Sequence, residues 1–170
     1  MADLTLAEME EILYRHEMAE LSEDLDATMA TVVANPHYEF PSWGWAADGP
    51  EAVREHYRRA LADLDRGDPA SKMRVHGVGP NTLFREASFS FNREDGQRVT
   101  GQYLAVIEFD PVEKKVKSER QYGDSLFAEY LAPHCGPDYG EIPGVSRLNS
   151  TIEPITREDM YAEAARVLDA

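Results

Sequence analysis

The chain has 170 residues, a length typical of one domain, which excludes two full enzyme domains. Hydrophobic residues make up 42% and charged residues 29%, the composition of a compact globular domain and not of a disordered chain or a membrane bundle. With 17 Lys and Arg against 32 Asp and Glu, the net charge of −15 repels phosphate backbones and anionic lipids, so we expect neither a nucleic acid nor a membrane as partner.

Cysteine usage and the start of the chain indicate a reducing compartment. Cys135 has no second cysteine with which to form an intrachain disulfide, and no Cys/His cluster has metal-ligand spacing. The first residues are acidic and lack a basic segment followed by an apolar one, and no stretch approaches the roughly 18 apolar residues of a membrane span. We therefore expect a soluble cytoplasmic protein that holds no metal.

Two amphipathic helices are predicted at the N-terminus. Apolar residues recur at helical spacing over residues 5–21. The same spacing resumes after Ser22, a candidate N-cap, until Asn35-Pro36 forbids its continuation. Residues 37–41 then alternate too briefly for more than an edge strand, and a loop follows.

A third helix and a strand meander are predicted next. Asp48 and Glu51 have capping-box spacing, and residues 53–64 carry apolar residues on one helical face. The apolar period then changes from 3.6 to 2, which indicates strands separated by tight turns. The predicted strands cover residues 72–78, 83–91, 99–109 and 116–122.

The last part of the chain differs in composition. Pro and Gly are frequent beyond Leu131, which predicts an irregular arm without regular strand pairing. Thr156 and Asp159 form a capping-box pattern before a short terminal helix, which we expect to dock on the body or on another subunit. The predicted organisation is one domain over residues 1–131 and a dependent arm and helix over residues 132–170.

Helices first and strands second predict an α+β domain with three helices packed on one curved antiparallel sheet. Three phrases sharpen this prediction: HYEFP at residues 37–41, Gly49 with Glu-Ala-Val and an aromatic soon after it, and ERQYGD at residues 119–124. Together they resemble the SnoaL-like branch of the nuclear-transport-factor-2-like (cystatin-like α+β) superfamily, which includes polyketide-cyclase-like and ketosteroid-isomerase-like proteins. The resemblance covers residues 5–131. It implies a cone with an apolar pocket and a homodimer that packs through the outer sheet face.

The resemblance implies a catalytic acid/base role for Asp124, since the matching Asp of polyketide cyclases has that role. The alternative is that Asp124 caps the helix that follows it. On a regular strand Tyr122 faces the same side as Asp124 and Glu119 faces the other. Unless a bulge intervenes, Glu119 is then a surface or interface carboxylate outside the catalytic set. His56 lies on an apolar helix face, where it is either a general base or a satisfied core histidine.

Aromatic residues and a second histidine are candidates for the pocket lining, although each has an alternative as a core or dimer residue. These candidates are His16, Tyr38, Phe40, Trp43, Trp45, Tyr57, Phe89 and Tyr103. No phosphate loop, nucleophile elbow or metal-binding pair appears in the sequence. We therefore expect an enzyme of the isomerase, cyclase or dehydratase type that acts without a cofactor on a small hydrophobic molecule. The alternatives are a noncatalytic binding protein for a hydrophobic metabolite and a dimeric assembly module.

Overall fold

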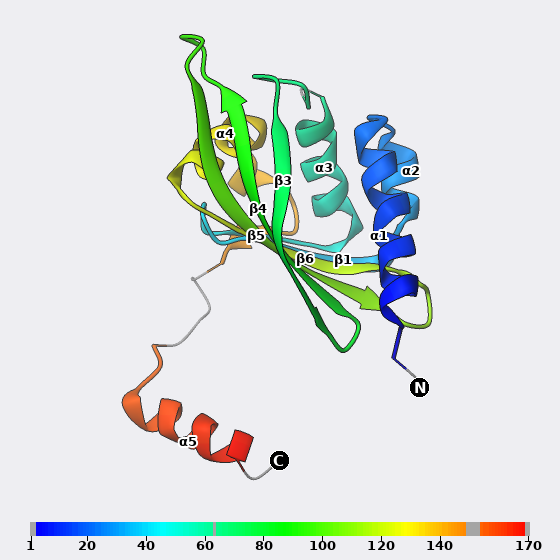
Figure 1. Ribbon diagram of the computed structural model, residues 1–170, viewed down its shortest axis with the longest axis vertical. Coiled ribbons are helices and arrows are strands. Elements are labelled where there is room, and N and C mark those ends of the chain that lie inside the picture. The colour runs from blue at the N-terminus through cyan, green and yellow to red at the C-terminus, as the bar shows by residue number, and fades with distance from the viewer. Residues whose placement is uncertain (1–2, 63, 149–153, 169–170) are drawn as a thin grey trace.

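The computed structural model describes residues 3–62, 64–148 and 154–168. It is an α+β fold in which the helices α1 to α4 lie against one side of a curved seven-stranded sheet (Figure 1). The helices are α1 (Leu6–Leu21), α2 (Leu25–Ala30), α3 (Gly49–Leu61), α4 (Ser125–Cys135) and α5 (Arg157–Leu168), with a 3-10 turn η1 (Tyr139–Glu141). The strands are β1 (Val32–Phe40), β2 (Trp45–Asp48), β3 (Ala70–Gly79), β4 (Thr82–Asn92), β5 (Arg98–Asp110), β6 (Lys115–Gly123) and β7 (Val145–Arg147).

The sheet order is β3-β4-β5-β6-β1-β2-β7. The predicted α+β class and curved sheet are confirmed, and the four predicted strands of the meander are β3 to β6. One strand pair differs from the antiparallel prediction, because β1 lies parallel to β6. The main core fills the space between the inner sheet face and α1 to α3, with Tyr38, Phe40 and Val53 fully buried.

The second helix is shorter than predicted. Its N-cap is Asp24, not Ser22, and it ends at Ala30. The chain then continues directly into β1, which passes through Pro36. The β1–β6 register shifts between Val32 and His37, so Pro36 lies at an irregularity of the strand pair. At this position the sheet does not need the backbone N–H that proline lacks.

The third helix begins where predicted but without the predicted cap. Asp48 makes no side-chain capping bond; its carboxylate instead contacts His37 Nδ1 at 2.7 Å. Trp45, expected in a loop, belongs to the short strand β2.

The prediction of an unpaired C-terminal arm is wrong for residues 145–147. Helix α4 continues through Pro133 to Cys135, so the expected boundary at 131/132 lies inside a helix. Tyr139 is buried in the main core, and β7 pairs antiparallel with β2 as an edge strand. A Cβ at position 144 would lie 2.4 Å from the Asp48 carbonyl oxygen, so Gly144 permits this close approach.

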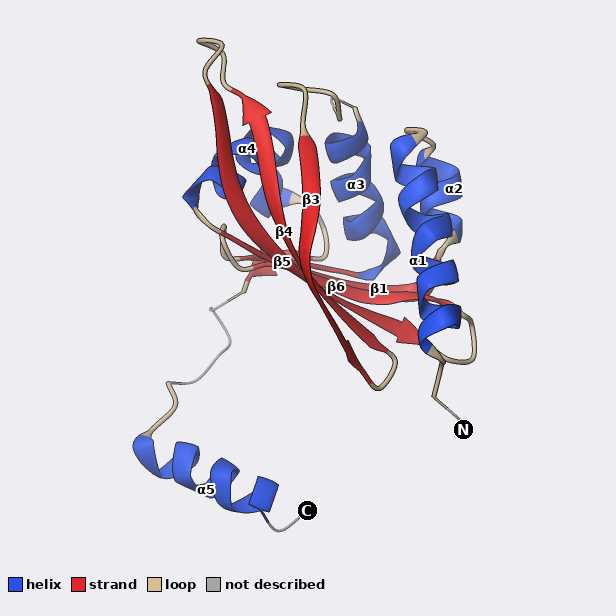
Figure 2. Cartoon of the chain, in the orientation of Figure 1, coloured by secondary structure: helices blue, strands red, loops and turns tan. Residues whose placement is uncertain are grey.

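The terminal helix α5 has the predicted capping box. The Asp159 carboxylate accepts from Thr156 N at 2.8 Å, and Thr156 Oγ1 accepts from Asp159 N at 3.2 Å. Its described side chains are exposed, and α5 is drawn apart from the other elements (Figure 2). Docking on its own body is therefore not observed, while docking on another subunit stays a prediction. None of the described helices has the length and hydropathy needed to cross a membrane.

Candidate functional site

A cavity of about 390 Å³ opens between α1, the inner face of β4 to β6, and α4. This volume suits a small-molecule ligand. One end is apolar and aromatic, lined by Phe89, Tyr103, Phe127, Tyr130 and Leu131. The other end is polar, lined by His16, Glu17, Glu20, Arg85, Glu119 and Gln121.

A bulge places Glu119 in this cavity. Phe109 pairs with Val116, but the next residue of β5, Glu108, pairs with Ser118, so β6 has one extra residue at this point. Val116 points inward, and beyond the bulge the inward-facing positions of β6 are shifted by one residue. Beyond the bulge Glu119 pairs with Ile107, a buried inner-face residue, whereas Tyr122 is 42% exposed on the outer face. The prediction that Glu119 faces away from the pocket is therefore wrong.

The surroundings of Glu119 favour its protonated form. Gln121 Nε2 donates to Glu119 Oε1 at 3.0 Å. Burial, followed by the negative charge of Glu20, raises the pKa of Glu119 to about 7. A carboxyl group with a pKa near neutrality can both take and return a proton under physiological conditions.

His16 presents a second titratable group to the cavity. The Thr31 hydroxyl donates its hydrogen to the Thr28 carbonyl at 2.6 Å, so at 2.6 Å from His16 Nδ1 it acts as acceptor. Nδ1 therefore carries a hydrogen, and Nε2 is the nitrogen that titrates. Burial lowers the pKa of His16, but the nearby carboxylates, Glu20 foremost, outweigh burial and raise that pKa above its usual value.

Two buried tyrosines hold His16 from behind. His16 Nε2 lies 2.9 Å from the Tyr57 hydroxyl and 3.2 Å from Glu20 Oε1. Tyr57 in turn donates to the Tyr38 hydroxyl at 3.1 Å. Burial raises the pKa of both phenols well above the usual value, so both remain neutral hydrogen-bonding groups. The chain of contacts fixes the ring of His16 and directs Nε2 toward Glu20.

Arg85 closes the polar end from β4. Its guanidinium donates to Glu17 Oε1 at 2.8 Å and also to the carboxylate of Glu10. His76 contacts the same Glu10 at 3.2 Å. Arg85 is therefore already shared between two carboxylates of α1.

The aromatic end is built by α4 packing on the sheet. Tyr103 and Phe127 stack with ring centroids 4.8 Å apart, and Phe89 contacts Tyr130 at 4.6 Å. A Cβ at position 123 would lie 2.2 Å from the Phe127 ring, so Gly123 allows α4 to approach β6 this closely. Of the predicted pocket residues, His16, Phe89 and Tyr103 line the cavity, while Tyr38 and Tyr57 lie behind His16.

Asp124 adopts the capping role. Its Oδ1 accepts from the backbone N–H groups of Leu126 and Phe127, each at 3.0 Å, and its Oδ2 accepts from Gln102 N at 2.9 Å. The side chain is exposed, and neither Asp124 nor Tyr122 lines the cavity. The structure thus does not bring the predicted catalytic pair to the pocket.

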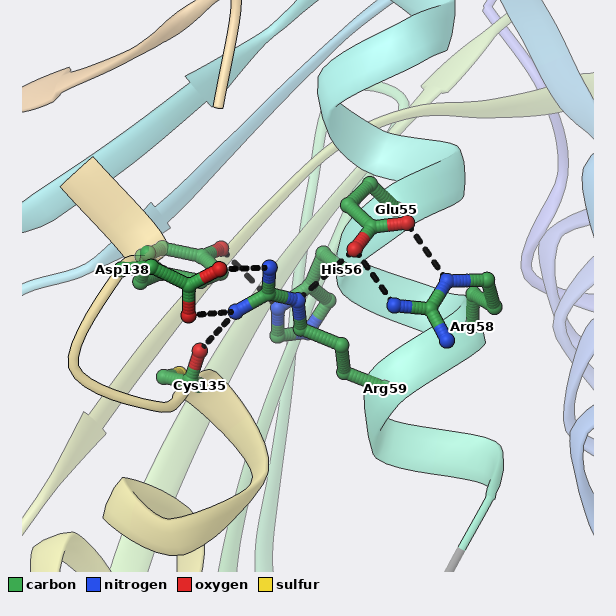
Figure 3. Close-up of polar contacts among 7 residues, drawn as sticks. Glu55, His56, Arg58, Arg59, Cys135 and Asp138 are labelled. Atoms are coloured by element: carbon green, nitrogen blue, oxygen red, sulfur yellow. Dashed lines mark hydrogen bonds and ion pairs between the residues drawn. The ribbon is translucent and has the colours of Figure 1, made fainter. Parts of the chain in front are cut away.

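His56 is the satisfied core histidine of the two alternatives. It stacks on Phe40 at 4.2 Å, and its Nδ1 lies 3.0 Å from the Tyr139 hydroxyl. Burial lowers the pKa of His56 to about 4, which keeps it neutral. Beside it, Arg59 of α3 binds the Asp138 carboxylate and the Cys135 carbonyl, which fastens the C-terminal arm to the helix (Figure 3).

The two tryptophans support the C-terminal arm and α4 and do not line the cavity. Trp43 Nε1 donates to the Ala128 carbonyl at 3.1 Å, and its ring stacks with Phe127. Trp45 packs against Tyr139 on one side, and the Arg147 guanidinium lies 3.7 Å from its ring centroid. The expectation that they line the pocket is therefore not met.

Sequence reasoning found His16 but missed the other residues of the polar end of the cavity. Glu17 and Glu20 read as solvated positions of α1, although Glu20 follows His16 at the i,i+4 spacing of a helical ion pair. Arg85 falls in the same alternating set as Leu83 and Ala87, and its charge was assigned no role. For Glu119 the decisive signal is the bulge, which strand alternation alone does not reveal.

A second hollow of about 410 Å³ lies by the β4–β5 turn and α4. Its polar lining includes Arg93 and Glu129, which form a bidentate pair at 2.6 and 2.7 Å. Both side chains are surface groups whose charges are mutually satisfied, so the first cavity is the better candidate for chemistry.

No family model matches the chain, and no curated protein matches it. Solved structures do. A SnoaL-like polyketide cyclase from Jannaschia sp. CCS1 aligns with a TM-score of 0.57 at 16% identity, over 81% of this chain and 100% of that one. An LEH-like epoxide hydrolase from M. tuberculosis aligns with a TM-score of 0.55 at 18% identity, over 74% of this chain and 89% of that one. A protein of unknown function with a cystatin-like fold from Methylobium petroleophilum PM1 aligns with a TM-score of 0.56 at 16% identity, over 73% of this chain and 80% of that one. The fold is therefore the cystatin-like α+β fold of nuclear-transport-factor-2-like proteins.

Proposed function

We propose that the protein is an acid/base enzyme that moves a proton on a small, largely apolar substrate, with Glu119 as the group that takes and returns the proton. The observation that carries this proposal is the position of Glu119, which lies in the cavity with its charge opposed by burial and by Glu20. A surface carboxylate with a structural role needs neither a place in a cavity nor surroundings that oppose its charge.

The steps follow from the lining. Ionised Glu119 accepts a proton from a substrate carbon or hydroxyl next to an electron-withdrawing group, and the protonated acid returns it at a second atom of the same substrate. His16, with its titrating Nε2 beside Glu20, is the partner that stabilises the charge developing on the substrate. The aromatic end holds the substrate body away from water. Isomerisation, cyclisation and dehydration all use such a transfer.

The structural neighbours support a pocket enzyme of this type. They include a polyketide cyclase and an epoxide hydrolase, and both names describe reactions of small organic molecules. At 16% and 18% identity these likenesses supply the fold, so the proposed chemistry depends on the geometry of Glu119.

The test is solvent exchange. The protein is incubated in D₂O with a panel of small cyclic and aryl ketones and enones, and deuterium uptake and isomerisation are followed by proton NMR. We expect Glu119→Gln to reduce catalysed exchange by about 10²- to 10⁴-fold. The matched variant Glu113→Gln changes an exposed carboxyl group on a turn and should retain full exchange. If both variants exchange at the wild-type rate, Glu119 is not the base; if the probes bind but do not exchange, the protein is a binding module.

A further inference from the structure

We infer that the ligand of this cavity carries a positive charge, as a protonated amine or iminium head held at Glu119, joined to an apolar or aromatic body that packs toward Phe89, Tyr103 and Phe127. The inference rests on the proposed function, since it names the substrate class of the same site.

The first argument is the distribution of charge at the polar end. Glu17 is paired with Arg85 at 2.8 Å, and Glu20 is paired with His16 at 3.2 Å. Glu119, by contrast, receives a neutral amide hydrogen bond from Gln121, and no described cation forms an ion pair with it. With His16 protonated, the inner lining from α1, β4 and β6 still has one carboxyl group more than it has cations.

The second argument excludes an anionic head. Arg85 is the permanent cation among the described residues that line the cavity, and it already binds Glu10 and Glu17. An anion would therefore meet the carboxylates of Glu17, Glu20 and Glu119 without a free cation to offset them. A neutral head leaves Glu119 protonated and gains no ion pair, so it should bind more weakly than a cation of the same shape.

The third argument is the separation between the two ends. Along β6, Glu119 is four residues from Gly123, which pairs with Tyr103. Four residues of strand span about 13 Å. Between them the inner face presents Ala105 and Gln121, a small side chain and an uncharged one, which leaves room for a linear ligand. A cationic head and a ring separated by a short chain match this layout.

The same geometry links binding to protonation. The groups around Glu119 are Glu17, Glu20 and His16 from α1, Arg85 from β4, Tyr38 from β1 and Tyr57 from α3. Burial, followed by the negative charge of Glu20, favours its neutral form, and the positive charge of His16 opposes this only in part. A cation at Glu119 favours the ionised form. Binding of an amine at pH 7 should therefore release protons, whereas binding of its alcohol analogue should not.

The experiment uses three probes that share one body and differ in the head: 4-phenylbutylamine, 4-phenylbutan-1-ol and 4-phenylbutyrate. Binding to the full chain is measured by calorimetry at pH 7 in phosphate and in Tris, which have different ionisation enthalpies. We expect the amine to bind at least tenfold more tightly than the alcohol, the carboxylate to bind most weakly, and proton release to accompany the amine alone.

Two variants separate the cavity from the general attraction of an anionic protein for cations. Glu119→Gln should remove the preference for amine over alcohol while leaving alcohol binding intact, which also shows that the variant is folded. Glu113→Gln removes the same charge from the surface and should leave the preference unchanged. Equal binding of amine and alcohol, equal effects of the two variants, or no binding of any probe at millimolar concentration would each overturn the inference.

This result is independent of the test of the proposed function. Selective amine binding without any Glu119-dependent exchange would retain the cation site and refute the enzyme. Glu119-dependent exchange on neutral ketones together with equal amine and alcohol binding would retain the enzyme and refute the cation site.

Discussion

Asp124 and Glu119 lie five positions apart on one segment and have opposite surroundings. Asp124 is exposed, and its carboxylate accepts three backbone hydrogen bonds. Glu119 lies in the cavity and accepts one amide hydrogen bond. Burial beside another carboxylate stabilises the neutral form of Glu119. Asp124 therefore suits a structural role as a helix cap, and Glu119 suits proton transfer.

Substitutions at Asp124 should affect stability and leave proton transfer intact. Asp124→Asn keeps an acceptor for the helix cap but turns an NH₂ group toward Gln102 N, so we expect a loss of about 1 kcal/mol in the free energy of unfolding. Asp124→Ala, which removes all three bonds, should lose about 2 kcal/mol. Urea denaturation measures both values. Asp24→Asn at the α2 cap, which accepts one N–H, is the control and should lose a few tenths.

Catalysed exchange should persist in Asp124→Asn. A loss of exchange of 10²-fold or more in this variant, with its stability nearly intact, would return the acid/base role to Asp124 and remove it from Glu119.

Glu119 should make the fold less stable as pH rises. Its folded pKa of about 7 lies above its usual value, so the folded state binds more protons than the unfolded state between about pH 4.5 and 7. The free energy of unfolding therefore falls through this window as pH rises. Because Gln cannot ionise, Glu119→Gln should be more stable than wild type at pH 8, by an amount on the order of 1–2 kcal/mol, and nearly equal to it at pH 4.5.

Urea denaturation at both pH values measures this difference. His16 also has a raised pKa, to which the charge of Glu119 contributes, so the difference between wild type and Glu119→Gln includes the interaction between these two groups. Equal stabilities of wild type and Glu119→Gln at both values would contradict the buried titration of Glu119.

At the scale of elements, the sequence predicted well where one period ran without interruption. α1, α3 and the β3 to β6 meander each show an unbroken apolar period, and each forms close to its predicted range. Prediction was wrong where a local break was compensated by tertiary contacts. Pro36 read as the end of a helix but lies within β1, because the β1–β6 register shifts there.

The same limit explains the partial prediction of the site. Aromatic side chains and His16 were found from their apolar faces, but Glu119 depended on a single extra residue in β6. A one-residue slip moves a side chain to the opposite face of the sheet, and strand periodicity does not report it. The arm was misjudged for a related reason: Gly144 and Pro143 are compatible with a short edge strand when its neighbour β2 is already in place.

Two neighbouring arginines of α3 allow a matched test of the contact between α3 and the C-terminal arm. Arg59 binds Glu55, Asp138 and the Cys135 carbonyl and is mostly buried, whereas Arg58, its neighbour, binds Glu55 from an exposed position. Arg59→Met should lower the free energy of unfolding by about 2 kcal/mol and expose residues 136–148 to limited proteolysis. Arg58→Met should change it by less than about 0.5 kcal/mol. Equal effects of the two substitutions would show that the arm is held without the contacts of Arg59.

At the scale of the whole molecule, the outer sheet face is the surface that the cavity does not use. It carries the cross-strand pairs Phe84 with Val106 and Leu104 with Tyr122. Phe84 is 39% exposed and Tyr122 42% exposed, in a chain whose net charge of −15 otherwise favours separation of copies. An exposed apolar patch on a sheet face is typical of an interaction surface.

We predict a homodimer that packs through this face. Light scattering at micromolar concentration should give the mass of two chains. Tyr122→Glu places a charge within the patch and should weaken association at least tenfold, because each copy would bury an unpaired carboxylate against the other. Tyr14→Glu makes the same chemical change on α1, where Tyr14 is 63% exposed, and should leave the dimer intact. A wild-type protein that remains monomeric would refute the dimer, and a dimer that tolerates Tyr122→Glu would place the interface elsewhere, with the exposed helix α5 as the next surface to test by deletion of residues 154–170.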